Sequence, residues 1–202
     1  MTFEDFTANY PTVSHEKATP AAMRRVATLF GIDCREVARS RVLEIGSGSG
    51  MNVVSLALLY PSAEFVGMDF SRAVVDRANE FAKELGVRNA FFELTTLEDE
   101  TYGPGELYDY VIVPRLYSWT DEQSREVLLQ LVKRVLTENG LALLSYNTYP
   151  GWNVVRTVRE MMLYHVANFK DAEKRALEAR KLLNFVVANN EKMPVEPYRE
   201  LI

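Results

Sequence analysis

The sequence contains a single cysteine, Cys34, and only two histidines among its 202 residues. One cysteine excludes a disulfide within the chain and fits a reducing compartment. Because thiols and imidazoles are so few, no cluster has metal-ligand spacing, and we expect no metal site. No apolar run approaches the length of a membrane span, and the acidic start MTFEDFTANY lacks the features of a signal peptide. These absences predict a cytoplasmic protein without a membrane span.

An excess of positive charge is also missing. The chain has 23 Lys and Arg residues against 28 Asp and Glu residues, which gives a formal net charge of −5. This balance supplies no general attraction to nucleic-acid phosphates or anionic lipid, so we expect no nucleic-acid partner. The composition of 48% hydrophobic and 25% charged residues is typical of a globular domain with a full core.

The segment 42–50, VLEIGSGSG, is the most informative part of what is present. An apolar stretch runs into three alternating glycines, Gly46, Gly48 and Gly50, and the following NVVSLALLY has helical spacing. This order predicts a strand, a tight turn and a helix. Alternating glycines let the backbone approach a ligand closely, and the helix N-terminus offers unpaired N–H groups to an anionic group. We therefore expect a ligand at this turn.

Three residues around the glycines distinguish the possible ligands. The dinucleotide fingerprint requires a glycine where this chain has Met51, which disfavours a nicotinamide or flavin. Glu44 would repel a pyrophosphate and attract the ammonium group of an amino-acid moiety. A second apolar segment ends at Asp69, about twenty residues past the turn, where an acid can bind both hydroxyls of a ribose. Ribose and an amino acid on one ligand indicate S-adenosylmethionine.

Strands alternate with helices over most of the chain, which is typical of a parallel sheet with helices on both faces. The apolar patterns predict strands at 41–45, 64–69, 90–94, 108–113 and 141–147. They predict helices at 16–32, 50–60, 72–86 and 120–140. The last of these helices is expected to begin at Thr120 or Asp121 and to end before Gly140.

Two further details of the helices follow from the sequence. The helix at 16–32 is expected to bury an apolar stripe and to end at Gly31; the stripe consists of Ala21, Val26, Leu29 and Phe30. Ser71 is expected to cap the helix at 72–86.

The pattern changes after the fifth strand. From Val154 to Ile202 the sequence shows helical periodicity and then a turn-rich end, without strand-like alternation. We expect a core with an N-terminal helical cover at 1–152, and a helical extension or the start of an insertion at 153–202. The fifth strand would form an apolar sheet edge, and we expect the C-terminal helices or a second copy of the chain to cover it. A homodimer is therefore one possible assembly.

The motif E-x-G-x-G-x-G at 44–50 and the acid after the second strand resemble the class I S-adenosylmethionine-dependent methyltransferases. The resemblance implies an α/β, Rossmann-like fold with five parallel strands in the order 3-2-1-4-5 and helices on both faces, followed here by an all-helical segment. In the complete class I sheet an antiparallel hairpin supplies strands six and seven. No segment of this chain fits that hairpin, so we expect those two strands to be absent from it.

A closer resemblance depends on SYNTYPGW at 145–152, REMMLYH at 159–165 and LYSW at 116–119. These segments are similar to bacterial methyltransferases with a C-terminal regulatory domain, whose few characterised members methylate protein lysines. The resemblance implies S-adenosylmethionine-dependent N-methylation of a protein acceptor. It departs at Pro114 and Arg115, where that group usually has His-Gly. A methyltransferase acting on a small-molecule acceptor, and a non-catalytic cofactor-binding module, stay as alternatives.

The candidate site residues lie at the carboxyl ends of the predicted strands, where open α/β sheets bind ligands. Thr96 stands where the resembled proteins place an acid against the adenine, so the backbone of Leu97 is expected to contribute instead. Asn52 is expected to bond the methionine carboxylate of the cofactor or to cap its helix. The expected cofactor contacts are Glu44, Gly46, Ser47, Gly48, Gly50, Asn52, Asp69, Phe70, Ser71, Thr96, Leu97, Pro114 and Arg115. The expected catalytic residues are Tyr117, Asn147 and Tyr149.

Overall fold

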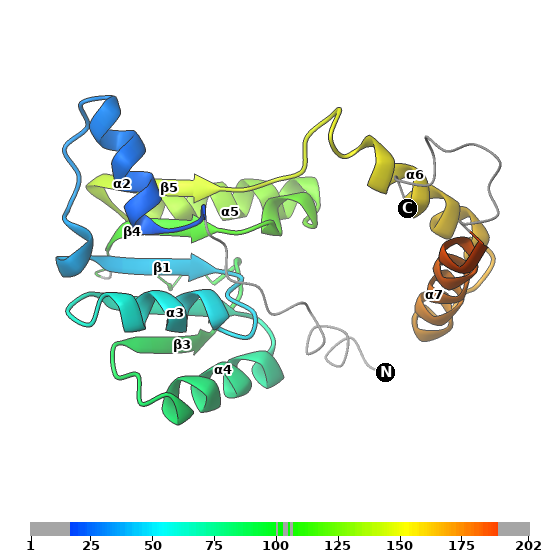
Figure 1. Cartoon of the computed structure of the whole chain (residues 1–202), viewed down its shortest axis with the longest axis horizontal. Coiled ribbons are helices and arrows are strands. Elements are labelled where there is room, and N and C mark those ends of the chain that lie inside the picture. The colour runs from blue at the N-terminus through cyan, green and yellow to red at the C-terminus, as the bar shows by residue number, and fades with distance from the viewer. Residues whose placement is uncertain (1–16, 100, 103–104, 106, 190–202) are drawn as a thin grey trace. The chain divides into compact units, whose positions relative to one another are not determined.

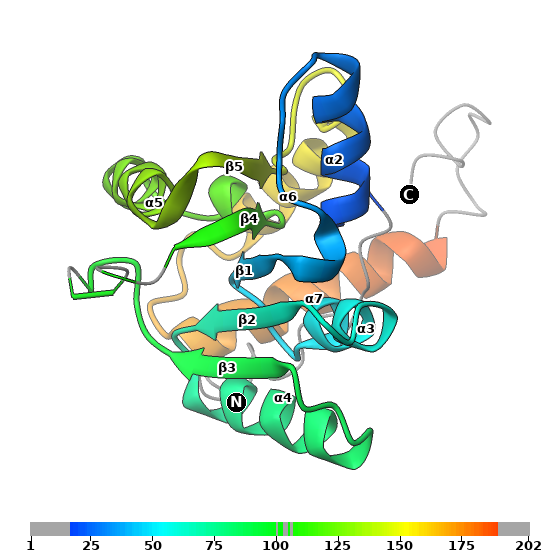
Figure 2. The same ribbon diagram turned by 90° about the vertical axis from the view of Figure 1, so that its left-hand side faces the viewer.

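The structure, a computed structural model, describes residues 17–99, 101–102, 105 and 107–189. It divides into two compact units, one ending at Tyr146 and the other beginning at Asn147. The first unit contains a five-stranded parallel sheet in the order β3-β2-β1-β4-β5, within the chain shown in Figure 1 and with all five strands labelled in Figure 2. The predicted strand order is therefore confirmed.

Three of the strands, β1, β2 and β4, are apolar and mostly buried, as expected inside a sheet covered on both faces, whereas the edge strands β3 and β5 are more exposed. The first four have the predicted bounds: β1 is Arg41–Ile45, β2 is Glu64–Asp69, β3 is Ala90–Leu94 and β4 is Tyr108–Val113. The edge strand β5 is Leu136–Leu144.

Helices cover the two faces of the sheet unequally. The helices of this unit are α2 (Pro20–Leu29), α3 (Met51–Leu59), α4 (Arg72–Glu84) and α5 (Glu122–Val135). The helices α2, α3 and α4 lie on one face of the sheet and α5 lies on the other (Figure 2). Their buried side chains form two separate cores. Successive residues of a strand point to opposite faces of the sheet, so Val42 lies in the core under α2, α3 and α4, and Leu43 lies in the core under α5.

The apolar stripe predicted for α2 was wrong. Thr19 caps the helix through a hydrogen bond from the backbone N–H of Ala22 to its hydroxyl, and the buried residues are Pro20, Met23 and Ala27. The expected core residues Val26, Leu29 and Phe30 are 55%, 85% and 78% exposed. Both stripes have helical spacing, and tertiary packing favours the one in which Met23 reaches the core with Ala18. Gly31, at φ +70°, follows the helix end as predicted.

The boundary between α5 and β5 also differs from the prediction. The carboxyl group of Asp121 accepts a hydrogen bond from Ser124 N at 2.8 Å and caps α5, but the helix ends at Val135. Leu136 instead takes extended dihedrals and pairs with Tyr108. The register between β4 and β5 then shifts in a bulge that includes Gly140, where a Cβ would lie 2.8 Å from Leu136 Cδ2. Gly140 thus allows tight packing within a strand and does not end a helix.

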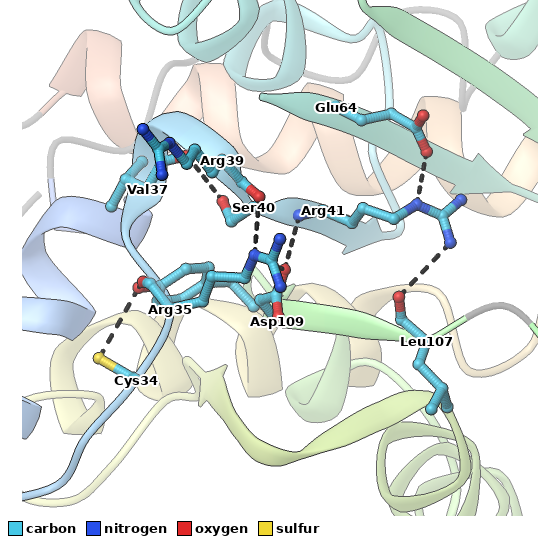
Figure 3. A network of polar contacts seen from close by, with 10 residues as sticks. Cys34, Arg35, Val37, Arg39, Ser40, Arg41, Glu64, Leu107 and Asp109 are labelled. Atoms are coloured by element: carbon cyan, nitrogen blue, oxygen red, sulfur yellow. Dashed lines mark hydrogen bonds and ion pairs between the residues drawn. The ribbon is translucent and has the colours of Figure 1, made fainter. Parts of the chain in front are cut away.

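Charged and polar groups pair at the amino-terminal ends of β1, β2 and β4 (Figure 3). Asp109 accepts a hydrogen bond from the backbone N–H of Arg41 at 2.9 Å. The Arg41 side chain reaches Glu64 at 2.6 Å, and its guanidinium lies 5.0 Å from the centre of the Tyr108 ring. The hydroxyl of Tyr110, on β4, donates to the backbone carbonyl of Arg35. This network joins the three strands at the end opposite the glycine turn.

The second unit is helical in its described part. It contains α6 (Asn153–His165) and α7 (Ala172–Asn189), which pack against each other. Between β5 and Asn189 no further strand is present, as predicted for this range. None of the helices in the described part of the chain is long and apolar enough to cross a membrane. The covering of the β5 edge, the homodimer and the cytoplasmic location stay predictions, and residues 190–202 lie outside the description.

Candidate functional site

The glycine turn connects β1 to α3 at the carboxyl end of the sheet. Gly46, Gly48 and Gly50 all have positive φ, at +75°, +54° and +75°. The backbone N–H groups of Gly46 and Ser47 both donate to the carbonyl of Met68 on β2, at 2.9 and 3.1 Å. The turn is therefore fixed to the neighbouring strand, and α3 begins directly after Gly50.

Each of the three glycines meets a different environment. A Cβ at Gly50 would lie 2.5 Å from the Phe92 ring and 2.9 Å from the Ala78 side chain, so Gly50 allows α3 to pack closely. A Cβ at Gly46 would lie 3.5 Å from Leu116. At Gly48 a Cβ would meet no described atom within 4 Å. Open space at Gly48 is what a ligand bound against the backbone requires.

Glu44 is a buried acid directly beneath this turn. Its side chain is 3% exposed, and its Oε2 accepts a hydrogen bond from Asn52 Nδ2 at 2.5 Å. Burial raises the pKa of Glu44 from 4.5 to about 7, although the Asn52 hydrogen bond opposes the shift. Asn52 also donates to the carbonyl of Ala18 at 3.3 Å. Its position therefore indicates that it orients Glu44.

Ser47 supplies a polar atom that the described protein does not satisfy. Its hydroxyl oxygen is buried and has no hydrogen-bond partner among the described residues. It lies close to β2 at Gly67, where a Cβ would be 2.7 Å away. Buried polar atoms are usually paired, so an unpaired hydroxyl in a ligand-binding turn is a candidate ligand contact. The sequence analysis missed Gly67, although a lone glycine inside an apolar strand signals close backbone approach.

Asp69 lies at the carboxyl end of β2, as predicted. Its Oδ2 accepts a hydrogen bond from Gly48 N at 3.1 Å, and its Oδ1 accepts one from Ser71 N at 3.0 Å. Each carboxylate oxygen can accept more than one hydrogen bond, so both can still bind ligand hydroxyls. Ser71 occupies the N-cap position of α4 as expected, but no hydrogen bond from its side chain caps the helix.

The remaining candidates near β2 and β3 surround this acid. Phe70, directly after Asp69, is 52% exposed. Thr96 follows β3, and its carbonyl accepts a hydrogen bond from Asp99 N at 3.3 Å. The Leu97 side chain packs against the core beneath the sheet. A contact between the Leu97 backbone and a ligand stays a prediction.

Residues after β4 approach the same turn. Arg115 has a φ of +61° and is the one non-glycine residue with positive φ among the described residues. Its N–H donates to Ser145 Oγ at 2.7 Å, and Leu116 N donates to Pro114 O at 2.7 Å. The Leu116 side chain then lies against Gly46. Ser145 was not among the predicted site residues, because no local pattern distinguishes it from an ordinary strand-end residue.

Tyr117 is the predicted catalytic residue that lies in the sheet unit. Its ring centre is 5.6 Å from that of Tyr146, with the two planes tilted by 53°. The Arg125 guanidinium lies 5.3 Å from the Tyr117 ring centre, and its Nε donates to the Tyr117 carbonyl at 3.0 Å. The other two, Asn147 and Tyr149, belong to the second unit, so the grouping of all three in one site stays a prediction.

Together these groups match the parts of one ligand. A buried acid suits an ammonium group, the helix N-terminus and the Ser47 hydroxyl suit a carboxylate, and Asp69 suits a diol. S-adenosylmethionine carries all three. Among the described residues, no three side chains of His, Cys, Asp or Glu come together as metal ligands would.

Comparisons with known proteins lead to the same family. A family model described as a methyltransferase domain matches residues 42–140. An uncharacterized protein of Rickettsia prowazekii is 38% identical over 193 residues, which cover 96% of this chain and 34% of that protein. A second uncharacterized protein of that organism is 30% identical over 179 residues, covering 88% of this chain and 70% of that protein.

A solved structure agrees with these matches. PKMT2 from Rickettsia typhi, in complex with AdoHcy, has a TM-score of 0.73 and 30% sequence identity, over 91% of this chain and 35% of PKMT2. The chain thus spans about a third of the length of PKMT2 and of the first Rickettsia prowazekii relative. The glycine turn, the sheet order and these relatives show that the chain belongs to the class I S-adenosylmethionine-dependent methyltransferases.

Proposed function

We propose that this protein transfers a methyl group from S-adenosylmethionine to the side-chain amine of a protein lysine. The observation that supports cofactor binding most directly is the open space at Gly48 between the buried acid Glu44 and the carboxylate of Asp69. The likeness to PKMT2, whose structure contains AdoHcy, supports the same cofactor. The lysine acceptor is supported by that likeness and by the segments at 145–152 and 159–165.

The proposed roles follow from the positions of the residues. Ionised Glu44, held by Asn52, attracts the ammonium group of the cofactor, and Asp69 accepts hydrogen bonds from the ribose hydroxyls. Bound S-adenosylmethionine supplies a methyl group on a sulfonium: the S–CH₃ bond breaks, sulfur keeps the electron pair, and the acceptor nitrogen forms the new bond with its lone pair. Because the protein mainly has to align donor and acceptor, positioning provides most of the catalysis.

The acceptor amine must lose its proton before it can attack. The rings of Tyr117 and Tyr146 offer apolar faces to the methylene chain of the acceptor lysine. Arg125 places a fixed positive charge beside Tyr117. A nearby cation disfavours a protonated amine and so favours the neutral, nucleophilic form. Tyr146 and Trp119 are 57% and 55% exposed, which suits an acceptor presented on the surface of another protein.

Two measurements test the proposal. Calorimetry with S-adenosylmethionine tests cofactor binding, which a non-catalytic cofactor-binding module would share with an enzyme, so only methyl transfer separates these two. Transfer of labelled methyl groups from the cofactor to lysate fractions then tests the acceptor, with mass spectrometry to locate the label. Label on lysine side chains supports the full proposal, whereas label confined to the small-molecule fraction would overturn its lysine part. A Gly48→Val variant serves as the inactive control.

A further inference from the structure

Arg115 is held in a conformation that ordinary side chains avoid. Its φ of +61° and ψ of −17° lie in the left-handed region, where a Cβ is unfavourable. The hydrogen bond from Leu116 N to Pro114 O, at 2.7 Å, closes a three-residue turn around it. Turns of this hand are rare and strained. Strain of this kind persists only where surrounding contacts enforce it, and it is concentrated at functional sites.

The contact that enforces it comes from the neighbouring strand. Ser145 follows β5, and its backbone N–H donates to Val113 O at 3.0 Å, which continues the pairing of β4 with β5. Its hydroxyl then accepts the N–H of Arg115 at 2.7 Å. The same residue therefore fixes the end of β4 and the strained residue two positions later. The bond joins residues 30 positions apart in the sequence.

The strained turn determines where the next two side chains lie. Leu116 is placed against Gly46 in the glycine turn, 3.5 Å from the position of a Cβ there. Tyr117 is placed beside Tyr146 and under the guanidinium of Arg125. An unstrained Arg115 would redirect the backbone that carries both residues. The geometry therefore connects the cofactor side of the site, through Leu116, with the proposed acceptor side at Tyr117.

We propose that Ser145 is a positioning residue, whose hydroxyl holds Arg115 in its strained turn and thereby aligns the acceptor amine at Tyr117 with the cofactor at the glycine turn. This inference extends the proposed methyl transfer and depends on it. Ser145 does not touch the reacting atoms and acts through Arg115. Its removal should therefore lower turnover while leaving the groups that bind the cofactor in place.

The test compares four variants: Ser145→Ala, Ser145→Thr, Arg115→Gly and the double variant Ser145→Ala/Arg115→Gly. Ser145→Ala should lower kcat about tenfold, because a displacement of the acceptor amine by about 1 Å from its aligned position strongly slows the transfer. The Kd for S-adenosylmethionine should change by less than about threefold, because Glu44 and Asp69 are untouched. Ser145→Thr keeps the hydroxyl and should restore kcat. Thr28→Ala removes an exposed hydroxyl on α2 and is the matched control.

Glycine at position 115 separates positioning from a general structural effect. Glycine adopts positive φ without strain, so the hydroxyl should matter little in the Arg115→Gly background. Ser145→Ala should there lower kcat by less than about twofold. An equal loss of kcat in both backgrounds would overturn the proposal, as would an unchanged kcat in folded Ser145→Ala.

Hydrogen exchange of the Arg115 amide provides a readout that needs no activity. In the cofactor-free protein this amide should exchange slowly in the wild type and in Ser145→Thr, and at least about tenfold faster in Ser145→Ala. Slow exchange in Ser145→Ala would contradict the inference even if the protein proved inactive. Absence of methyl transfer by the wild type, with the exchange pattern as expected, would instead refute the proposed function and leave Ser145 as a structural clamp only.

Discussion

The two ends of the parallel sheet are built on opposite principles. At the amino-terminal ends of β1, β2 and β4, charges and hydrogen-bonding groups are paired between Arg41, Asp109 and Glu64 (Figure 3). The Tyr110 hydroxyl donates to the backbone carbonyl of Arg35. The carboxyl-terminal ends contain a buried acid with a raised pKa, a buried hydroxyl with no hydrogen-bond partner among the described residues, and a strained backbone residue. Each feature of the second kind costs free energy in the protein alone.

This difference indicates which end is shaped for a ligand. Unfavourable features persist where function requires them and where the rest of the fold supplies enough stability. The amino-terminal network connects three strands and contributes stability that offsets the free-energy costs of the carboxyl-terminal end. Substitutions at the carboxyl end should therefore change binding or pH dependence, whereas those at the amino end should change stability alone.

The largest effect is expected for Gly48→Val. A branched side chain would fill the open space of the turn and should weaken S-adenosylmethionine binding about a thousandfold, or about 4 kcal/mol. Gly86, after α4, is a matched control because it also has positive φ, at +67°, and its Cβ position is likewise open. Gly86→Val should show a similar backbone cost in thermal unfolding with unchanged affinity in calorimetry. Equal affinities in the two variants would remove Gly48 from the site.

The next effect is a pH dependence caused by Glu44. Its pKa is about 7 in the folded protein against an ordinary 4.5, so the folded state binds its proton more tightly than the unfolded state does. The stability from this group is full below about pH 4.5 and is lost as pH rises through 7, a loss of about 3 kcal/mol.

Glu44→Gln removes this titration. Urea unfolding between pH 4.5 and 8 should show the variant gaining about 3 kcal/mol relative to wild type as pH rises. Cofactor binding by the wild type should strengthen over the same range, because only ionised Glu44 attracts the ammonium group. Glu80→Gln, on the exposed face of α4, should reproduce the wild-type pH profile. Parallel profiles for wild type and Glu44→Gln would show that Glu44 does not titrate in this range.

Asp69→Ala should weaken cofactor binding by about 2 to 3 kcal/mol, because charge-assisted hydrogen bonds to the ribose are lost. The substitution also removes the carboxylate that accepts a hydrogen bond from the Gly48 N–H, so the glycine turn should become more mobile. Calorimetry measures the affinity, and Asp76→Ala on the exposed side of α4 is the control. A folded Asp69→Ala protein with wild-type affinity would contradict the ribose assignment.

The smallest effect tests the other end of the sheet. Asp109→Ala leaves the backbone N–H of Arg41 without its acceptor and should lower the free energy of unfolding by about 1 to 2 kcal/mol. Glu64→Ala breaks a half-exposed ion pair in the same network and should cost less than about 1 kcal/mol. Denaturant unfolding measures both costs, and cofactor affinity should stay unchanged. A large loss of affinity in Asp109→Ala would break the proposed division between the two ends.

The sequence predicted those parts of the site that depend on local patterns. The spacing of Gly46, Gly48 and Gly50 after an apolar strand was sufficient for the turn, because a backbone with positive φ selects glycine directly. The position of Asp69 followed from the length of a β-α-β unit. Ser145 could not be found in this way, since it matters only through a partner far away in the sequence.

By itself the sequence determined the alternating strands and helices and the glycine turn, because hydrophobic periodicity, helix caps and glycine spacing act over a few residues. The strand order was implied by the resemblance to the class I methyltransferases, and the structure confirms it. Tertiary structure decided which stripe of α2 is buried, that α5 ends at Val135, and that Asn52 serves Glu44. Two helical faces or two helix ends can be equally consistent with local preference. The choice between them depends on the packing and hydrogen bonds that distant segments offer, which only the assembled fold contains.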